Sequence, residues 1–246
     1  EDDDKEIIDF YEQIELSQLS ENKLIQFAES FNASNMTNHL WAKIRLCFNK
    51  KQKNVEINKE RYKLITKTIK LEYDGNKSHS MSGIIDYLTK KSGGNVSENG
   101  TVKVTSLGQY SDDRTAKNAV DIHNTQNYYE TKGAKNSWLI YDFGERKVHP
   151  THYSIRTRHD GDSNHPRNWV IEGSNSGSDN DWTTLDKRQN EATLTGINTT
   201  ITFDIKEYEG YYKFLRFHQI GNSSSDNLYT AISALEYYGT LFLPNS

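Results

Sequence analysis

With 246 residues, of which 34% are hydrophobic and 11% aromatic, the chain can bury at least one core, and its aromatic content argues against disorder. A formal net charge of -4 excludes the broad basic field that recruits nucleic acid or anionic lipid without specificity. The single cysteine, Cys47, cannot form an intrachain disulfide, which favours a reducing, intracellular compartment.

The stretch from about Ile7 to Lys70 shows the hydrophobic periodicity of amphipathic helices and contains no glycine or proline. Apolar spacing predicts two helices, and Thr37 and Asn58 are N-cap candidates for two more. Glu1–Lys5 is either a native acidic lead-in or a protease-tag remnant, and it carries no weight for the fold. The apolar positions of the four helices are Ile7, Ile8, Tyr11 and Ile14; Leu24, Phe27, Ala28 and Phe31; Leu40, Trp41, Ile44, Cys47 and Phe48; and Tyr62, Leu64, Ile65 and Ile69.

The composition changes near residues 74–82, because all 15 glycines and all three prolines lie from Gly75 onward. Beyond this point, short aromatic and β-branched runs alternate with polar turn clusters, which is typical of strands joined by turns. We therefore predict a helical segment over residues 1–75 and a mainly β domain, a jelly-roll sandwich, over residues 76–246. The predicted strands are Thr101–Leu107, Trp138–Phe143, Thr151–Arg158, Trp169–Glu172, Trp182–Leu185, Thr199–Asp204, Tyr211–Gln219 and Ala231–Tyr238.

No motif for catalysis is present. The chain lacks a G-x-S-x-G elbow, a P-loop, a G-x-G-x-x-G turn and an H-E-x-x-H helix, so we expect no enzyme. No apolar run reaches the length that spans a bilayer, and the N-terminus is acidic rather than signal-like, so we expect no membrane insertion. We expect an intracellular protein, in the cytoplasm or associated with the cytoskeleton.

Four short segments of the predicted β domain carry a recognisable ordered set of motifs. They are Lys117–Asp121 with Tyr129 eight residues on, Ser137–Gly144, Trp169–Asn175 with Trp182 after a polar loop, and Phe214–Phe217 with Ile232–Gly239. In this order they resemble the discoidin domain, also called the coagulation-factor type C domain, which has a galactose-binding-like fold. The resemblance covers roughly Ser82 to Leu241.

The resemblance implies a β-sandwich in which Trp138, Trp169 and Trp182 are core residues. The helical lead-in is similar to the BACK-type segment that follows BTB domains in protist proteins combining BTB, BACK and discoidin modules. If both similarities hold, the chain is a fragment or a BTB-less relative of a cytoplasmic adaptor.

Candidate ligand contacts gather at the end of the strand Thr151–Arg158. Alternation places His152, Ser154, Arg156 and Arg158 on one polar, cationic face, which we interpret as solvated. Galactose-binding modules of this fold contact sugar through a strand-end arginine and a following loop asparagine, and Arg158 with Asn164 resembles that pair. Two other end loops supply further candidates. The predicted ligand contacts are Arg158, Asn164, His123, Tyr129, Tyr229 and Arg156.

A metal site is implied by the same resemblance. Asp121 and Glu236, with Asn124, occupy positions that resemble a calcium site, where carboxylate and backbone oxygens bind a hard cation. Ile122 and Asn127 depart from the glycine and threonine that the family has there. No cofactor is certain from the sequence, and calcium is the one candidate.

The leading functional hypothesis is a non-catalytic adaptor that binds a protein partner or polar ligand through the end loops of the sandwich. The first alternative is a carbohydrate-binding lectin of the galactose-binding type. The second is a structural component of a cytoskeletal or ciliary assembly. No nucleic acid is expected as a partner.

Overall fold

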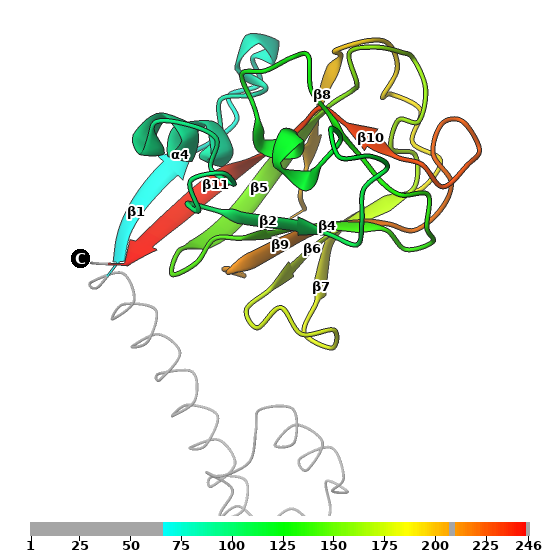
Figure 1. The fold of residues 1–246 in the computed structure, drawn as a ribbon. Helices are drawn as coiled ribbons and strands as arrows, with labels where there is room; N and C mark the ends of the chain where they lie inside the picture. The colour runs from blue at the N-terminus through cyan, green and yellow to red at the C-terminus, as the bar shows by residue number, and fades with distance from the viewer. Residues whose placement is uncertain (1–65, 207–209, 245–246) are drawn as a thin grey trace, which may run out of the picture. The chain divides into compact units, whose positions relative to one another are not determined.

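The computed structural model describes residues 66–206 and 210–244, which fold into two antiparallel sheets packed face to face (Figure 1). The strands are β1 (Thr66–Leu71), β2 (Lys103–Ser106), β3 (Tyr129–Glu130), β4 (Trp138–Asp142), β5 (Lys147–Arg156), β6 (Trp169–Ser174), β7 (Thr183–Arg188), β8 (Thr200–Asp204), β9 (Phe214–Gln219), β10 (Ala231–Ile232) and β11 (Ala234–Pro244). One sheet has the order β2-β4-β9-β6-β7 and the other β1-β11-β5-β8, while β10 pairs with β3. The predicted mainly β sandwich is confirmed.

Aromatic rings from the two sheets meet in the core. Tyr141 of β4 contacts Tyr237 of β11 edge-on, with ring centroids 5.4 Å apart. Trp169 of β6 contacts Phe203 of β8 in the same way, also at 5.4 Å. Such perpendicular ring pairs are favoured by the quadrupole of the aromatic system, in addition to the area they bury. The core is therefore built by large rings at inward-facing strand positions.

Only one of the three tryptophans predicted for the core lies in it. Trp169 is fully buried, whereas Trp138 and Trp182 are half-buried. Within β4, Leu139 and Tyr141 are the buried residues, so alternation directs Trp138 to the outer face of the sheet. The Trp182 ring lies 4.0 Å from the guanidinium carbon of Arg216, a contact that also belongs to an outer face. Alternation therefore corrects the prediction for these two residues.

The sandwich begins earlier than the predicted boundary at residue 75. The second of the two units of the chain spans Thr66–Ser246, and its first strand, β1, pairs antiparallel with β11. Ile69 was predicted on a helix, yet it lies in β1 opposite Leu241. The TKTIKL run of β1 contains three β-branched residues, and pairing with the long strand β11 decides its conformation. The other predicted helical positions lie outside the described residues.

A helix inside the β domain was missed by the sequence prediction. α4 (Ile84–Ser92) buries Ile84, Ile85 and Leu88 in the core, and Glu236 of β11 caps its N-terminus. One Glu236 oxygen accepts a hydrogen bond from the Ile85 amide at 2.7 Å, and the other from the Asp86 amide at 2.9 Å. This cap is 150 residues away in sequence, so no local signal predicts it. No helix among the described residues is long and apolar enough to cross a membrane.

Two short 3-10 helices complete the described elements. η2 (Lys77–His79) precedes α4, and η3 (Ala116–Val120) lies before β3. Ala119 and Val120 of η3 are fully buried, so this segment is anchored in the core. The loops before and after η3 are therefore each attached to the core at one end. They contain several residues of the candidate site.

Candidate ligand-binding site

The polar face that alternation assigned to β5 is covered rather than solvated, and Arg156 keeps only 6% of its surface exposed. Its two terminal nitrogens donate hydrogen bonds to the backbone carbonyls of Ile122 and Asn124, each at 2.9 Å. Its Nε donates to the Ser233 hydroxyl at 3.3 Å, and that hydroxyl donates to the Asn127 carbonyl at 2.8 Å. Burial lowers the pKa of Arg156. The guanidinium therefore fixes the loop over residues 122–127 and does not face a ligand.

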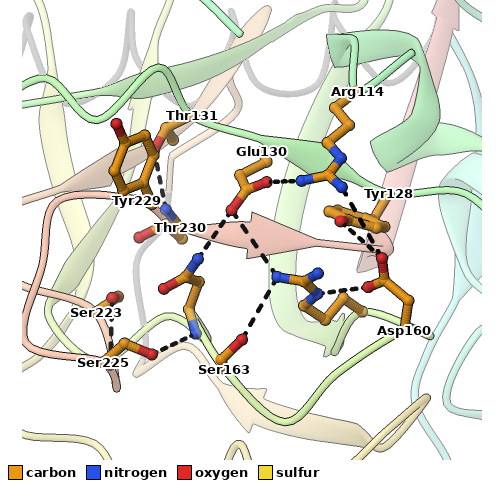
Figure 2. Close-up of polar contacts among 12 residues, drawn as sticks. Arg114, Tyr128, Glu130, Thr131, Asp160, Ser163, Ser223, Ser225, Tyr229 and Thr230 are labelled. Atoms are coloured by element: carbon orange, nitrogen blue, oxygen red, sulfur yellow. Dashed lines mark hydrogen bonds and ion pairs between the residues drawn. The ribbon is translucent and has the colours of Figure 1, made fainter. Parts of the chain in front are cut away.

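A second arginine, Arg158, follows the end of β5 and belongs to a cluster of charged side chains (Figure 2). Its Nε donates to Asp160 at 2.6 Å, and the Tyr128 hydroxyl donates to the other oxygen of that carboxylate at 3.0 Å. The guanidinium carbons of Arg158 and Arg114 lie 4.8 and 4.7 Å from the centre of the Tyr128 ring. One buried ring thus contacts two cations, an arrangement stabilised by the negative charge of the ring face.

Glu130 of β3 supplies a second carboxylate to this cluster and is almost completely buried. It accepts hydrogen bonds from Nη1 of Arg114 and, at 2.9 Å, from the side-chain amide of Asn164. Nη1 of Arg158 lies 4.0 Å from Oε1 of Glu130, the oxygen that accepts from Asn164. Figure 2 shows Glu130 between Arg114 and Tyr229. A buried carboxylate is tolerated only when it is paired in this way.

The charges of the cluster are stabilised by their neighbours. Burial works to lower the pKa of Arg114 and Arg158, but hydrogen bonds to Glu130 and Asp160, together with coulombic attraction from these carboxylates and from Tyr128, raise both values. Burial works to raise the pKa of Asp160, but its hydrogen bonds with Arg158 and Tyr128 outweigh burial and lower that value. Burial is the main reason why the pKa of the Tyr128 phenol is raised. At neutral pH the two guanidinium groups and Asp160 are therefore charged.

Asn164 connects the loops of this end to one another. Its backbone is in the left-handed region, with φ of 57°, which asparagine tolerates better than most residues. Its amide N–H donates to Ser225 at 2.9 Å, and its carbonyl accepts from Ala231 at 2.7 Å. Its side-chain oxygen accepts from the Asn227 amide at 3.1 Å. Asn164 therefore uses its polar groups to hold the site together.

Two exposed tyrosines lie beside the charges. Tyr110 and Tyr229 keep 56% and 36% of their surface exposed, and their rings meet edge-on with centroids 5.6 Å apart. The guanidinium carbon of Arg114 lies 5.1 Å from the centre of the Tyr110 ring. Gly133 gives room to Tyr229, because a Cβ at Gly133 would lie 2.7 Å from that ring. We call the following set the loop-end cluster: Tyr110, Arg114, Tyr128, Glu130, Arg158, Asp160, Asn164 and Tyr229.

Three of the predicted ligand contacts, Arg158, Asn164 and Tyr229, come together in the loop-end cluster, and the others lie elsewhere. Tyr129 is fully buried, and its hydroxyl donates to the Gly108 carbonyl at 3.0 Å. His123 lies 3.0 Å from the Asp86 carboxylate of α4, away from the cluster. The structure thus gives Tyr129 and His123 contacts within the fold instead of the predicted ligand contacts. The same holds for Arg156, because its guanidinium is covered.

Five members of the loop-end cluster were missed in the sequence, namely Tyr110, Arg114, Tyr128, Glu130 and Asp160. Strand alternation could have found Glu130, because a core position for Tyr129 directs its neighbours to the other face. Arg114 carries no such signal, since its partner Glu130 is 16 residues away. Asp160 lies only two residues from the predicted contact Arg158, which donates to it.

The three residues predicted to bind calcium make other contacts. Glu236 directs its carboxylate at the amide donors of α4, and Tyr237 donates a third hydrogen bond to it at 2.8 Å. The Asn124 carbonyl accepts from Arg156, and the Asp121 carbonyl accepts from the Asn124 amide at 3.0 Å. Amide donors and a guanidinium take oxygens that a calcium ion would need. In the described part of the chain no group of three His, Cys, Asp or Glu side chains is arranged to hold a metal ion.

No family model matches this chain. Over 113 residues the chain is 32% identical to the E3 ubiquitin-protein ligase Ufd4 of Drosophila melanogaster, a match that covers 44% of this chain and 4% of that protein. The chain therefore spans only a small part of this relative.

Solved structures with a similar fold include a Clostridium perfringens module, CpGH89CBM32-5, in complex with GalNAc-β-1,3-galactose. It shares 12% identity, covers 57% of this chain and 96% of its own, and has a TM-score of 0.46. A fucolectin from Morone saxatilis serum shares 18% identity over 59% of this chain and 48% of its own, with a TM-score of 0.47. The CBM62 of Clostridium thermocellum Xyl5A shares 24% identity over 57% of this chain and 94% of its own, with a TM-score of 0.45. None of these similarities assigns a ligand to this chain.

Proposed function

We propose that the β-sandwich is a non-catalytic, intracellular binding module that docks a protein partner through the loop-end cluster. The observation that carries this proposal is the exposed Tyr110–Tyr229 pair beside the half-buried Arg114 guanidinium. Tyrosine and arginine are enriched among the residues that dominate protein–protein binding energy, because they bury large area and keep a polar group. Among the large hydrophobic residues that are exposed, these two tyrosines are in contact with each other.

Rigidity of the cluster supports the same proposal. Hydrogen bonds that Glu130 and Asp160 accept, and that Asn164 donates and accepts, join four segments of the chain before any partner arrives. A preorganised surface loses less side-chain entropy on binding, so more of the contact energy appears as affinity. The similarity to a segment of an E3 ubiquitin-protein ligase supports a protein rather than a small molecule as the partner. The single cysteine supports the intracellular location.

Paired affinity purification from the native cell tests this proposal. The double variant Tyr110→Ser/Tyr229→Ser should lose a specific partner that the wild type and Ile197→Ser both retain. Ile197 is the matched control, because its exposed fraction of 55% is close to the 56% of Tyr110. Calorimetry with the identified partner should show affinity weakened about 30-fold or more, the loss typical of a binding hot spot. Equal affinity for wild type and double variant would contradict the proposal.

A carbohydrate ligand is the second candidate, favoured by the exposed rings of Tyr110 and Tyr229, which can stack on a pyranose. The polar pair predicted for sugar binding, Arg158 and Asn164, gives this candidate less support. Arg158 donates to Asp160 and the Asn164 side-chain amide donates to Glu130, so these donors are already in use. A glycan array with wild type and Tyr229→Ser separates the candidates. Binding to a defined glycan that is lost in the variant would favour the lectin.

A further inference from the structure

The hydrogen-bond acceptors of the loop-end cluster are already in use. Both Asp160 oxygens accept, one from Arg158 and the other from Tyr128. Both Glu130 oxygens accept as well, one from Arg114 and the other from Asn164. A ligand that offers mainly donors, such as an ammonium group, would have to displace one of these internal contacts.

Donors remain in excess. A guanidinium group carries five N–H groups, and a planar fork of two can bind one carboxylate. Within the described residues, Arg114 donates from Nη1 to Glu130, and its Nη2 lies 4.0 Å from Asp160 without a hydrogen bond. Arg158 donates from Nε to Asp160 and from Nη1 to Ser163. The side chain of Arg114 is 25% exposed, so its remaining N–H groups are within reach of a ligand. The cluster can therefore receive acceptors from outside.

The aromatic faces point to the same ligand chemistry. Tyr128 already contacts the guanidinium groups of Arg114 and Arg158, and Tyr110 contacts that of Arg114. A cation from a partner would therefore compete with the arginines of this chain for the same rings. The exposed parts of Tyr110 and Tyr229 are left for apolar contact beside an anionic group.

We infer that the loop-end cluster selects a carboxylate, an Asp or Glu side chain or a chain terminus, flanked by an apolar residue in a segment of the partner protein. This inference rests on the proposed function and adds the chemistry of the recognised group. The Arg114 fork binds the carboxylate, while the Tyr110–Tyr229 pair packs on the neighbouring apolar residue. Arg158 supports the fork through the shared Tyr128 ring.

Side-chain NMR of ¹⁵N-labelled protein tests the inference with two defined probes, N-acetyl-glutamate N-methylamide and its neutral isostere N-acetyl-glutamine N-methylamide, at equal ionic strength. The glutamate probe should shift the Nε–H resonances of Arg114 and Arg158 with a dissociation constant on the order of 1 mM, as expected for a fragment of this size. The glutamine probe should bind at least about tenfold more weakly, because it cannot form a charge-assisted fork.

Matched variants make the test specific. Arg114→Gln should abolish the glutamate-induced shifts at Arg158, whereas Arg188→Gln should leave them unchanged. Arg188 is the control because its side chain is likewise 25% exposed and likewise pairs with a carboxylate, that of Asp186. Equal binding of the two probes, or no shift with either, would overturn the inference. If the double variant Tyr110→Ser/Tyr229→Ser still lost its protein partner in that case, the proposed docking function would stand. Failure of the carboxylate inference and failure of the docking function are therefore distinguishable.

Discussion

Arg156 and Arg158 lie two residues apart at the end of β5, yet their guanidinium groups have different surroundings. Arg156 is buried against the backbone carbonyls of Ile122 and Asn124, with no carboxylate within ion-pair distance among the described residues. Arg158, just past the strand, pairs with Asp160 and contacts the Tyr128 ring at the molecular surface. The comparison teaches that one strand end holds two arginines in different surroundings: neutral oxygens around Arg156, and a carboxylate with a shared ring around Arg158.

The two arginines also depend on each other. The loop that Arg156 fixes, over residues 122–127, leads directly into Tyr128 and Glu130. Without a fixed loop, the ring shared by Arg114 and Arg158 would lose its position. Perturbing the buried arginine should therefore affect stability and binding together, while perturbing the surface cluster should mainly affect binding.

The largest effect is expected for Arg156→Met, which keeps most of the side-chain volume and removes the donors. The carbonyls of Ile122 and Asn124 would be left buried without partners, so the free energy of unfolding should fall by about 4 kcal/mol. Urea unfolding measures this loss. Arg167→Met is the control, since Arg167 pairs with the exposed Asp226, and it should cost less than about 0.5 kcal/mol. A similar small loss for both variants would contradict the structural role of Arg156.

The next effect is a pH dependence at Glu236. Burial raises the pKa of this carboxyl from 4.5 to about 7, although the amides of α4 work to lower it. Between these values the folded state keeps a proton that the unfolded state has released, so the free energy of unfolding falls as pH rises. The contribution is fully present below the unfolded pKa and declines by up to about 3 kcal/mol towards pH 8.

Glu236→Gln isolates this effect, because glutamine does not titrate. The difference in unfolding free energy between wild type and variant, measured from pH 4 to pH 8, should change steeply between about pH 4.5 and pH 7. Glu98→Gln is the control, since its exposed carboxylate pairs with Lys117 at the surface, and it should change the free energy of unfolding by less than about 0.5 kcal/mol. A flat curve for Glu236→Gln would show that the buried carboxyl titrates alike in both states.

The strands were predictable because alternation is local. The Trp138–Asp142 strand repeats buried and half-buried residues at every second position, and such a pattern can be read from one sequence. Trp169 was placed in the core through the resemblance to the discoidin domain, and it is fully buried. The helix α4 was hidden, because its nine residues are polar except for a short apolar face, and its cap is supplied by a distant strand. Long-range partners decide such elements.

The candidate site was only half predictable for a related reason. Arg158 and Asn164 were found through their place after a strand, which is a local feature. Arg114 becomes a site residue only because folding brings it to the Tyr128 ring, and no spacing in the sequence announces that meeting. Tyr129 was predicted from its place in the discoidin-like motif, whereas the fold buries that ring in the core and brings the neighbouring Tyr128 to the two arginines.

A double-mutant cycle between Arg114→Met and Glu130→Gln measures how tightly the surface cluster is built. We expect a coupling free energy of about 2 kcal/mol, because Glu130 is buried and its partner is mostly shielded from water. The exposed pair Arg167 and Asp226 should give less than about 0.5 kcal/mol in the same kind of cycle. Equal coupling in the two cycles would mean that the loop-end cluster is an ordinary surface ion pair without preorganisation.

The smallest effect on stability, and the sharpest contrast with Arg156, is expected for Tyr110→Ser. The ring is largely exposed and contributes an edge contact to Tyr229 and a cation contact to Arg114, so the unfolding free energy should fall by only about 0.5 to 1 kcal/mol. Thermal or urea unfolding beside partner binding gives both quantities on one variant. A large loss of stability would assign Tyr110 to the fold, whereas a small loss with abolished binding would show that this tyrosine is exposed for the sake of recognition.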